Sequence, residues 1–258
     1  MGVLNVTPDS FSDGGQFFDT EAAVRHGVRL AEEGAAFIDV GGESTRPGAA
    51  PVGVEEELRR VIPVIERLRA ATAAVISVDT SRPEVMRAAA AAGACLVNDV
   101  RALREAGALE AAVASGCAVC LMHMQGEPRT MQLAPAYGDV VSEVGAFLAE
   151  RVRVCRAAGL AAEQLVIDPG FGFGKTLEHN LTLLRRLREL GADGVPVMVG
   201  LSRKAMVGRL TGRPEGERLL GSVVLAVLAA LEGARIVRTH DVAATVEALR
   251  LVAAVRES

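Results

Sequence analysis

Two aspartates, an asparagine and a lysine each follow a short apolar segment of the chain, where they could bind a polar ligand. Asp79 and Asp168 end such segments directly, and so does Asn98. A carboxylate at the mouth of an apolar interior needs a partner, because an unpaired buried carboxylate is costly or takes up a proton. Lys204 can pair with one carboxylate, and a ligand with amine or ring N–H donors can satisfy the rest. The four residues predict a ligand site, with core ion pairs as the alternative.

Lysine is rare in this chain. Of the 28 basic residues only Lys175 and Lys204 are lysines, so the sequence otherwise uses arginine where it needs a cation. A lysine kept against this bias indicates a need for a compact ammonium, with chance as the alternative, more so for Lys175 than for Lys204. Asparagine is nearly as rare, and two of the three, Asn5 and Asn98, end predicted strands.

A second polar group has the opposite charge. Arg238 and His240 alternate along the last predicted strand, so both side chains project to the same side of it. Thr45 and Arg46 in the second long loop and Asn5 in the first strand are expected nearby. Arginine binds phosphate oxygens through two parallel hydrogen bonds, and a neutral asparagine can join phosphate oxygens around Mg²⁺. These residues predict an anion site, although Arg238 alone could instead form a surface salt bridge.

Eight short apolar segments must position these side chains. They are residues 2–5, 37–40, 75–79, 95–98, 119–123, 165–168, 197–202 and 236–240. Runs of Val, Ile and Leu are typical of parallel strands covered on both faces, and (β/α)8 barrels place their chemistry at the carboxyl ends of their strands. We predict an α/β fold with one domain, a single (β/α)8 TIM barrel over residues 1–258.

Segments with helical periodicity lie between the predicted strands. They are residues 20–33, 55–71, 84–92, 109–114, 139–158, 177–190, 215–231 and 241–255. This alternation makes the sheet parallel. The helix-to-strand turns are short, whereas the strand-to-helix loops lengthen at residues 5–19, 41–53 and 123–138. Long loops at one rim of a barrel indicate that the active site lies there.

One glycine-rich loop resembles a phosphate-binding motif without matching it. Residues 170–176 read Gly-Phe-Gly-Phe-Gly-Lys-Thr, but the P-loop spacing requires glycine where this chain has Pro169. We expect the loop instead to bring backbone N–H groups and Phe173 close to a ligand.

Composition narrows the function classes. Half of the 258 residues are hydrophobic and the formal net charge is −4, so no nucleic-acid groove is expected. The most apolar helical segment, residues 221–234, is shorter than the roughly 20 residues that span a bilayer, so no membrane span is expected. The chain starts without the basic segment of a signal peptide, and its four cysteines are scattered, which favours buried thiols. We expect a cytoplasmic protein.

Longer motifs carry a resemblance to a known family. Residues 2–15 (GVLNVTPDSFSDGG) resemble the first signature of dihydropteroate synthases, and residues 41–48 (GGESTRPG) resemble the second. The resemblance continues through residues 77–81, 98–99, 122–126, 168–175, 202–204 and 238–241. Motifs of this length, in order at seven or eight strand ends, are specific. The chain is identified as a member of this family of pterin-binding TIM barrels.

The resemblance implies a reaction, a cofactor and partners. Such enzymes transfer the 6-methylene-dihydropterin group from 6-hydroxymethyl-7,8-dihydropterin diphosphate to p-aminobenzoate, which forms 7,8-dihydropteroate for folate biosynthesis and releases diphosphate. The carbon–oxygen bond breaks first, in an SN1-like step, with Mg²⁺ as the cofactor. The expected partners are these small molecules, and the family's dimers imply a homodimer.

The resemblance also assigns residues to roles. The pterin would be held by Asp79, Asn98, Asp168 and Lys204, the diphosphate by Thr45, Arg238 and His240, the p-aminobenzoate by Arg46, Pro47, Phe173 and Lys204, and Mg²⁺ by Asn5. The catalytic residues would be Asp79, Lys204, Arg238 and His240. Among them, Asp79 would be the carboxylate that stabilises the pterin-methyl cation. Ala205 departs from the serine frequent in the family, so a hydroxyl contact is missing there.

Two other functions remain open within the same fold. A methyltetrahydrofolate-dependent corrinoid methyltransferase would share the pterin residues, but it has no use for a diphosphate site at Arg238 and His240. A non-catalytic pterin-binding paralogue would have lost the transfer residues, whereas this chain keeps Asn5, Asp79 and Lys204. The residues favour the synthase over both.

Overall fold

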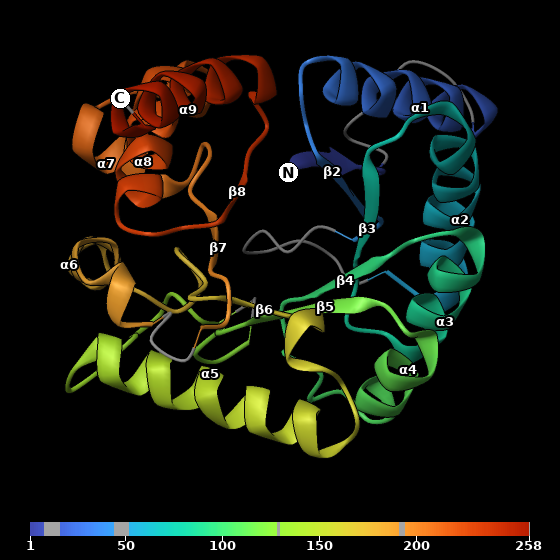
Figure 1. Cartoon of the computed structure of the whole chain (residues 1–258), viewed down its shortest axis with the longest axis horizontal. Coiled ribbons are helices and arrows are strands. Elements are labelled where there is room, and N and C mark those ends of the chain that lie inside the picture. The colour runs from blue at the N-terminus through green and yellow to red at the C-terminus, as the bar shows by residue number, and fades with distance from the viewer. Residues whose placement is uncertain (8–15, 44–51, 128–129, 191–193, 258) are drawn as a thin grey trace.

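Within residues 1–7, 16–43, 52–127, 130–190 and 194–257, which the computed structural model describes, eight parallel strands form the centre of the fold (Figure 1). The strands are β1 (Gly2–Asn5), β2 (Phe37–Gly41), β3 (Val75–Asp79), β4 (Leu96–Asp99), β5 (Ala118–Met122), β6 (Leu165–Asp168), β7 (Met198–Gly200) and β8 (Ile236–Arg238). Each lies within or next to a predicted segment, so the prediction of the strands is confirmed.

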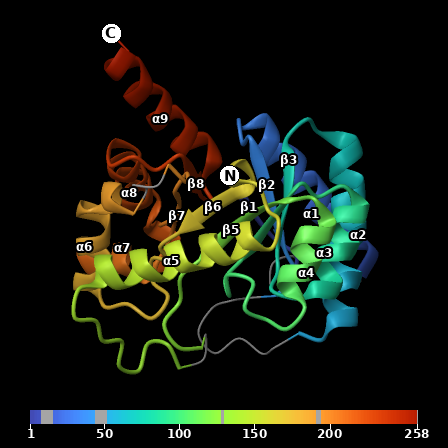
Figure 2. The same ribbon diagram turned by 60° about the horizontal axis from the view of Figure 1, so that its bottom comes forward.

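Helices surround the strands as an outer ring (Figure 1). They are α1 (Gln16–Glu32), α2 (Val54–Ala71), α3 (Pro83–Ala92), α4 (Ala108–Ser115), α5 (Val140–Ala157), α6 (Leu177–Arg185), α7 (Ala205–Thr211), α8 (Leu219–Leu231) and α9 (Val242–Glu257). Figure 2 shows the C-terminal end of α9 projecting from the body, away from the loop that follows β5.

Three helix predictions are wrong in part. The prediction lacks α7, whose seven residues include Gly208, a poor helix former. The helix predicted over residues 215–231 begins only at Leu219, after the 3₁₀ turn η4 (Glu215–Glu217), because Pro214 and Gly216 disfavour an earlier start. The helix predicted over residues 177–190 ends at Arg185 and gives way to the 3₁₀ turn η3 (Leu187–Glu189).

The strands close into a ring. β1 to β6 form one sheet in sequence order, and β7 pairs with β8 in a second. Single parallel bridges join the two sheets at both seams, Ile167 with Val197 and Gly2 with Thr239. At the second seam the Val3 N–H donates to the Thr239 carbonyl at 3.0 Å. The predicted TIM barrel is therefore confirmed, with its weakest pairing beside β7 and β8.

The interior of the barrel changes from apolar to polar along its axis. Its amino-terminal end is filled by apolar side chains, several of them from the first residues of strands: Met1, Phe37, Leu96, Ala118, Cys120, Val166, Met198 and Ile236. Polar side chains replace them at the carboxyl ends of the strands, where Asp39, Asn98 and Asp168 are buried. The apolar floor therefore leaves space for a ligand only at the carboxyl-terminal mouth.

Two expectations about compartment can be compared with the structure. No helix among the described residues is long and apolar enough to cross a bilayer. All four cysteines are unpaired, and Cys117, Cys120 and Cys155 are buried as expected. Cys95 is exposed, so the expectation of a buried thiol is wrong at this position.

Candidate active site

One row of residues crosses the mouth of the barrel. Asn5 is in register with Gly41, Gly41 with Asp79, and Asp79 with Asn98. Because side chains alternate along a strand, residues in one such row share one face. A Cβ atom at Gly41 would lie 3.4 Å from Asp79 Cβ and 3.9 Å from Asn5 Oδ1, so the glycine keeps the space between these side chains open.

Asp39 lies one layer deeper and is the residue that sequence reasoning missed. It is fully buried, and its carboxylate accepts hydrogen bonds from Ser77 Oγ at 2.6 Å and Asn98 Nδ2 at 2.9 Å. Arg238 Nε donates to the same carboxylate at 2.6 Å. The signal was available, because an aspartate two residues before a strand end interrupts an apolar run and must find donors inside the barrel.

Arg238 joins two acids of the mouth. Besides Asp39, its guanidinium donates from Nη2 to Asp79 Oδ2 at 2.9 Å. Burial raises the pKa of the Asp79 carboxyl to about 7, and Asp39 adds to this rise, whereas Arg238 opposes it. Asp79 thus exchanges its proton near neutral pH in the ligand-free protein. Two of the five guanidinium donors are used in these contacts.

Asp168 and Lys204 meet on the opposite side of the mouth. Asp168 is buried, and its Oδ1 accepts from the Gly170 N–H at 2.7 Å. Burial raises the pKa of its carboxyl, and the ammonium of Lys204 is the main opposing charge. Burial lowers the pKa of Lys204 to about 8 against the attraction of Asp168. Each of the two charges therefore shifts the pKa of the other, as expected for neighbours at one rim.

The glycine-rich loop after β6 packs tightly against the loop after β5. Gly170 has a φ of +68°, and a Cβ there would lie 1.9 Å from the His123 carbonyl oxygen. Gly174 has a φ of +61°, and a Cβ there would lie 2.3 Å from the Gln125 carbonyl oxygen. Only glycine fits such contacts. The loop places Phe173 against the site, with its ring centroid 4.7 Å from Lys204 Nζ.

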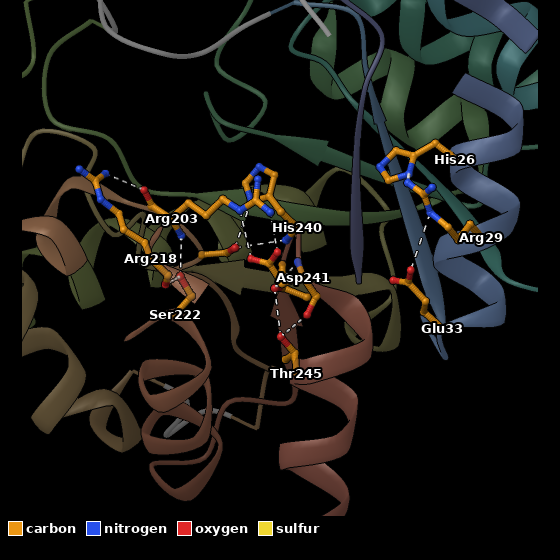
Figure 3. A network of polar contacts seen from close by, with 11 residues as sticks. His26, Arg29, Glu33, Arg203, Arg218, Ser222, His240, Asp241 and Thr245 are labelled. Carbon is orange, nitrogen blue, oxygen red and sulfur yellow. Dashed lines mark hydrogen bonds and ion pairs between the residues drawn. The ribbon is translucent and has the colours of Figure 1, made fainter. Parts of the chain in front are cut away.

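A polar network fixes the loops after β7 and β8 (Figure 3). His240 Nδ1 lies 3.0 Å from Ser202 Oγ, which also accepts from the His240 N–H at 3.2 Å. Arg203, at a φ of +59°, forms an ion pair with Asp241 and donates its N–H to Ser222 Oγ at 2.9 Å. The network holds the His240 ring through Ser202 and fixes the backbone of Arg203, the residue before Lys204.

A basic cleft lies beside His240. Its volume is about 510 Å³, and it is lined by Asn5 and His240 at the strand ends and by Arg25, His26 and Arg29 of α1. Figure 3 shows His26 and Arg29 on the α1 side, across from His240. Two of the predicted anion residues, Asn5 and His240, therefore line a cleft that also contains two arginines, of which Arg25 pairs with Glu21 and Arg29 with Glu33.

The predicted site residues divide into two groups. Those described by the structure lie at the carboxyl-terminal end of the barrel: Asn5, Asp79, Asn98, Asp168, Phe173, Lys204, Arg238 and His240. Thr45, Arg46 and Pro47 lie outside the described residues.

No cluster of three or more His, Cys, Asp or Glu that could hold a metal occurs in the described part of the chain. One neutral oxygen from Asn5, supplemented by phosphate oxygens and water, is a donor set that suits Mg²⁺.

Comparison with known proteins finds close relatives over the full length of the chain. Residues 1–240 match the model of the family described as pterin binding enzyme. The dihydropteroate synthase of Escherichia coli K12 is 56% identical over 254 residues, which cover 98% of this chain and 90% of that protein. Two crystal structures of Xanthomonas albilineans dihydropteroate synthase also align with 100% of this chain and 93% of theirs. One, with 4-aminobenzoic acid, has 58% identity and a TM-score of 0.95. The other, in complex with 7,8-dihydropteroate, has 55% identity and a TM-score of 0.92.

Proposed function

We propose that this chain, which belongs to the dihydropteroate synthase family of pterin-binding enzymes, joins a dihydropterin to p-aminobenzoate. It is a transferase of folate biosynthesis: the 6-methylene-dihydropterin group leaves 6-hydroxymethyl-7,8-dihydropterin diphosphate, and 7,8-dihydropteroate and diphosphate are the products. The observation that carries the proposal is the direct contact of Arg238 with Asp79 at one barrel mouth, 159 residues apart in sequence. A corrinoid methyltransferase, which releases no diphosphate, would not need Arg238 and His240 as an anion site.

The acids and the lysine hold the pterin edge. A pterin presents a 2-amino group and N3–H as donors and O4 and N5 as acceptors. Asp168 accepts from the donors, Asn98 can donate or accept, and the Lys204 ammonium donates to an acceptor.

Asp79 stabilises the charge that develops when the carbon–oxygen bond breaks. Loss of diphosphate leaves a pterin-methyl cation, and a fixed carboxylate beside it lowers the barrier. A nearby cation favours the ionised form of Asp79, whose pKa in the ligand-free protein is about 7. Arg238 keeps the carboxylate oriented through its 2.9 Å hydrogen bond. The arylamine, neutral at pH 7, then captures the cation without a strong general base.

We assign the departing diphosphate to Arg238, His240 and Thr45, and Asn5 would hold Mg²⁺. The support is the position of Asn5 and His240 on the wall of the basic cleft. When bound, Mg²⁺ would supply neutralisation of the diphosphate charge. We assign p-aminobenzoate to Phe173, the stem of Lys204, Arg46 and Pro47, and the 4.7 Å contact between the Phe173 ring and Lys204 supports the first two of these.

The test is an assay of diphosphate release by the purified chain. We expect release with pterin diphosphate, Mg²⁺ and p-aminobenzoate together, in proportion to the 7,8-dihydropteroate formed. Release should fall strongly when a chelator removes Mg²⁺ and return when Mg²⁺ is restored. Pterin binding without turnover would instead identify a non-catalytic paralogue, and methyl transfer from methyltetrahydrofolate to a corrinoid would identify the methyltransferase.

The protein works as a homodimer in the cytoplasm under the same proposal. Apolar side chains lie exposed on two neighbouring helices, among them Leu220 (75%) and Val224 of α8 and Leu251 (65%) and Val255 of α9. Such a surface suits a second copy of the chain. Sedimentation should give twice 26.9 kDa, and Leu220→Glu should shift the protein toward the monomer. A wild-type monomer at micromolar concentration would contradict the dimer.

The unpaired thiols fit a reducing compartment, which cell fractionation can check.

A further inference from the structure

Lys175 is the buried cation that the proposed function leaves without a role. Its side chain is only 2% exposed, yet its ammonium has neutral hydrogen-bond partners among the described residues. Nζ lies 2.9 Å from His123 Nδ1 and donates to the carbonyls of Gly170 and Phe173, each at 3.0 Å. A protonated amine has three donors, so the three nearest acceptors can use all of them, and the His123 carbonyl lies farther away at 3.5 Å. A buried ammonium of this kind is costly, which indicates that its contacts serve a purpose.

The contacts of Lys175 belong to a larger pattern in the glycine-rich loop. Six successive carbonyls, those of residues 170–175, each accept a hydrogen bond from a side chain. The donors are Lys175 to Gly170 and Phe173, Lys204 to Phe171, Gln132 to Gly172, Tyr137 to Gly174 and Asn180 to Lys175. Lys175 is the only donor in this set that bonds two of the six carbonyls within the described residues. It therefore fixes the turn from inside the loop, while the others hold it from outside.

The turn fixed by Lys175 carries two contacts of the active site. The Phe171 carbonyl lies between the two carbonyls that Lys175 binds, and it accepts from Lys204 Nζ. The ring of Phe173 belongs to the second of those residues and lies 4.7 Å from the same Nζ. A rotation of the turn would therefore move the Phe173 ring and Lys204 together.

His123 ties this turn to the neighbouring strand. Its N–H donates to the Asp168 carbonyl at 2.9 Å, and its ring packs edge-on against Phe147 with centroids 5.0 Å apart. Burial, and then the charge of Lys175, lower the pKa of the His123 ring to about 3, so the ring is neutral. Burial also lowers the pKa of Lys175 to about 7, and while its amine is protonated it donates to the unprotonated ring nitrogen Nδ1. The bond between Lys175 and His123 therefore connects the loop after β6 to the end of β5.

We infer that Lys175, anchored on His123, is a positioning residue that holds Phe173 and Lys204 in the geometry that p-aminobenzoate requires. The inference rests on the proposed function, because it presumes that the arylamine lies against Phe173. The pterin shares Lys204 with p-aminobenzoate, but its other three partners, Asp79, Asn98 and Asp168, come from other strands or from the strand before the loop. Loss of Lys175 should therefore affect the two substrates unequally.

The experiment compares Lys175→Met with the wild type in steady-state assays and in calorimetry. We expect the KM for p-aminobenzoate to rise by about 10²-fold, since misplacement by about 1 Å costs this much. The Kd for the pterin substrate should rise by no more than about tenfold, because three of its four partners keep their places. In Lys175→Ala, added propylammonium should restore a measurable part of the affinity for p-aminobenzoate, which a purely structural residue would not show.

Two further variants keep the test decisive. Tyr137→Phe removes a carbonyl partner from the outer end of the loop and should leave both substrate parameters within about threefold. If Lys175→Met does not fold, His123→Leu removes only one of the three acceptors and should raise the same KM by about tenfold. Equal losses for both substrates, or no change in either, would overturn the positioning role. An inactive wild type would instead refute the proposed function.

Discussion

Asp79→Asn is expected to lower kcat/KM by about 10³ while leaving the protein at least as stable at pH 8, because one preorganised charge contributes about this much to a transition state. Asparagine has the shape of the native side chain and can still accept from Arg238. It lacks the negative charge that stabilises the pterin-methyl cation. Steady-state kinetics with saturating p-aminobenzoate, together with urea unfolding, would measure both effects.

The sign of the change in unfolding free energy follows from the burial of the Asp79 carboxyl. Burial raises the pKa of Asp79 to about 7 in the folded protein, whereas an unfolded aspartate titrates near 3.9. The native state therefore holds a proton that the unfolded state has lost, and wild-type stability falls as pH rises from about 4 to about 7. The variant has no such proton. Its advantage in unfolding free energy should grow through this window and then remain constant.

Asp99→Asn is the matched control for this prediction. Asp99 is also a fully buried strand-end aspartate, but its oxygens accept from Ser81 Oγ and from the N–H groups of Arg101 and Leu103. Asparagine keeps only one of the two acceptor oxygens, and its amide nitrogen accepts no hydrogen bond. One of the two loop N–H groups therefore loses its acceptor, so this variant should lose stability while the turnover of the folded fraction stays near normal. Near-normal kcat/KM in Asp79→Asn would remove the role assigned to Asp79.

The site residues at the strand ends were predictable from the sequence, because each of these polar or charged residues ends an apolar run. Asp79, Asn98 and Asp168 could be found in this way, since a parallel barrel places every strand end at one rim. The same rule covers Asp39, but attention to the last residue of each strand left out the layer below it. A burial argument applied to every charged residue inside a strand would have found it.

Pairing between distant residues was not predictable. The alternation of Arg238 and His240 indicated that both side chains project to the same side of the strand. It could not indicate that the guanidinium of Arg238 contacts Asp39 and Asp79. That contact depends on barrel closure between β8 and β1, which no local pattern encodes. Lys175 illustrates the same limit, because rarity marked it as unusual and only the loop conformation shows what its ammonium binds.

Arg238→Met is expected to lower the free energy of unfolding at pH 8 by about 3–5 kcal/mol, because it removes one partner from a buried ionic group. Asp39 has no exposed surface in its side chain and Asp79 has 12%, so water cannot replace the guanidinium between them. Loss of the cation should raise the pKa of Asp79 above about 7, so the cost should shrink as pH falls from that higher pKa toward about 7 and stay constant below it, where the carboxyl is protonated in both proteins. Urea unfolding at a series of pH values on both sides of about 7 measures this change.

Two controls separate this buried group from an ordinary ion pair. Arg153→Met breaks an exposed pair with Glu150 and should cost far less than Arg238→Met, with little dependence on pH. Adding Asp39→Asn to Arg238→Met removes one of the two carboxylates left without a cation and should recover part of the loss, since a neutral amide can still accept from Ser77. A cost at pH 8 no larger than that of Arg153→Met would mean that solvent reaches both acids. Arg238 would then be a mobile ligand group rather than the fixed link between the two acids.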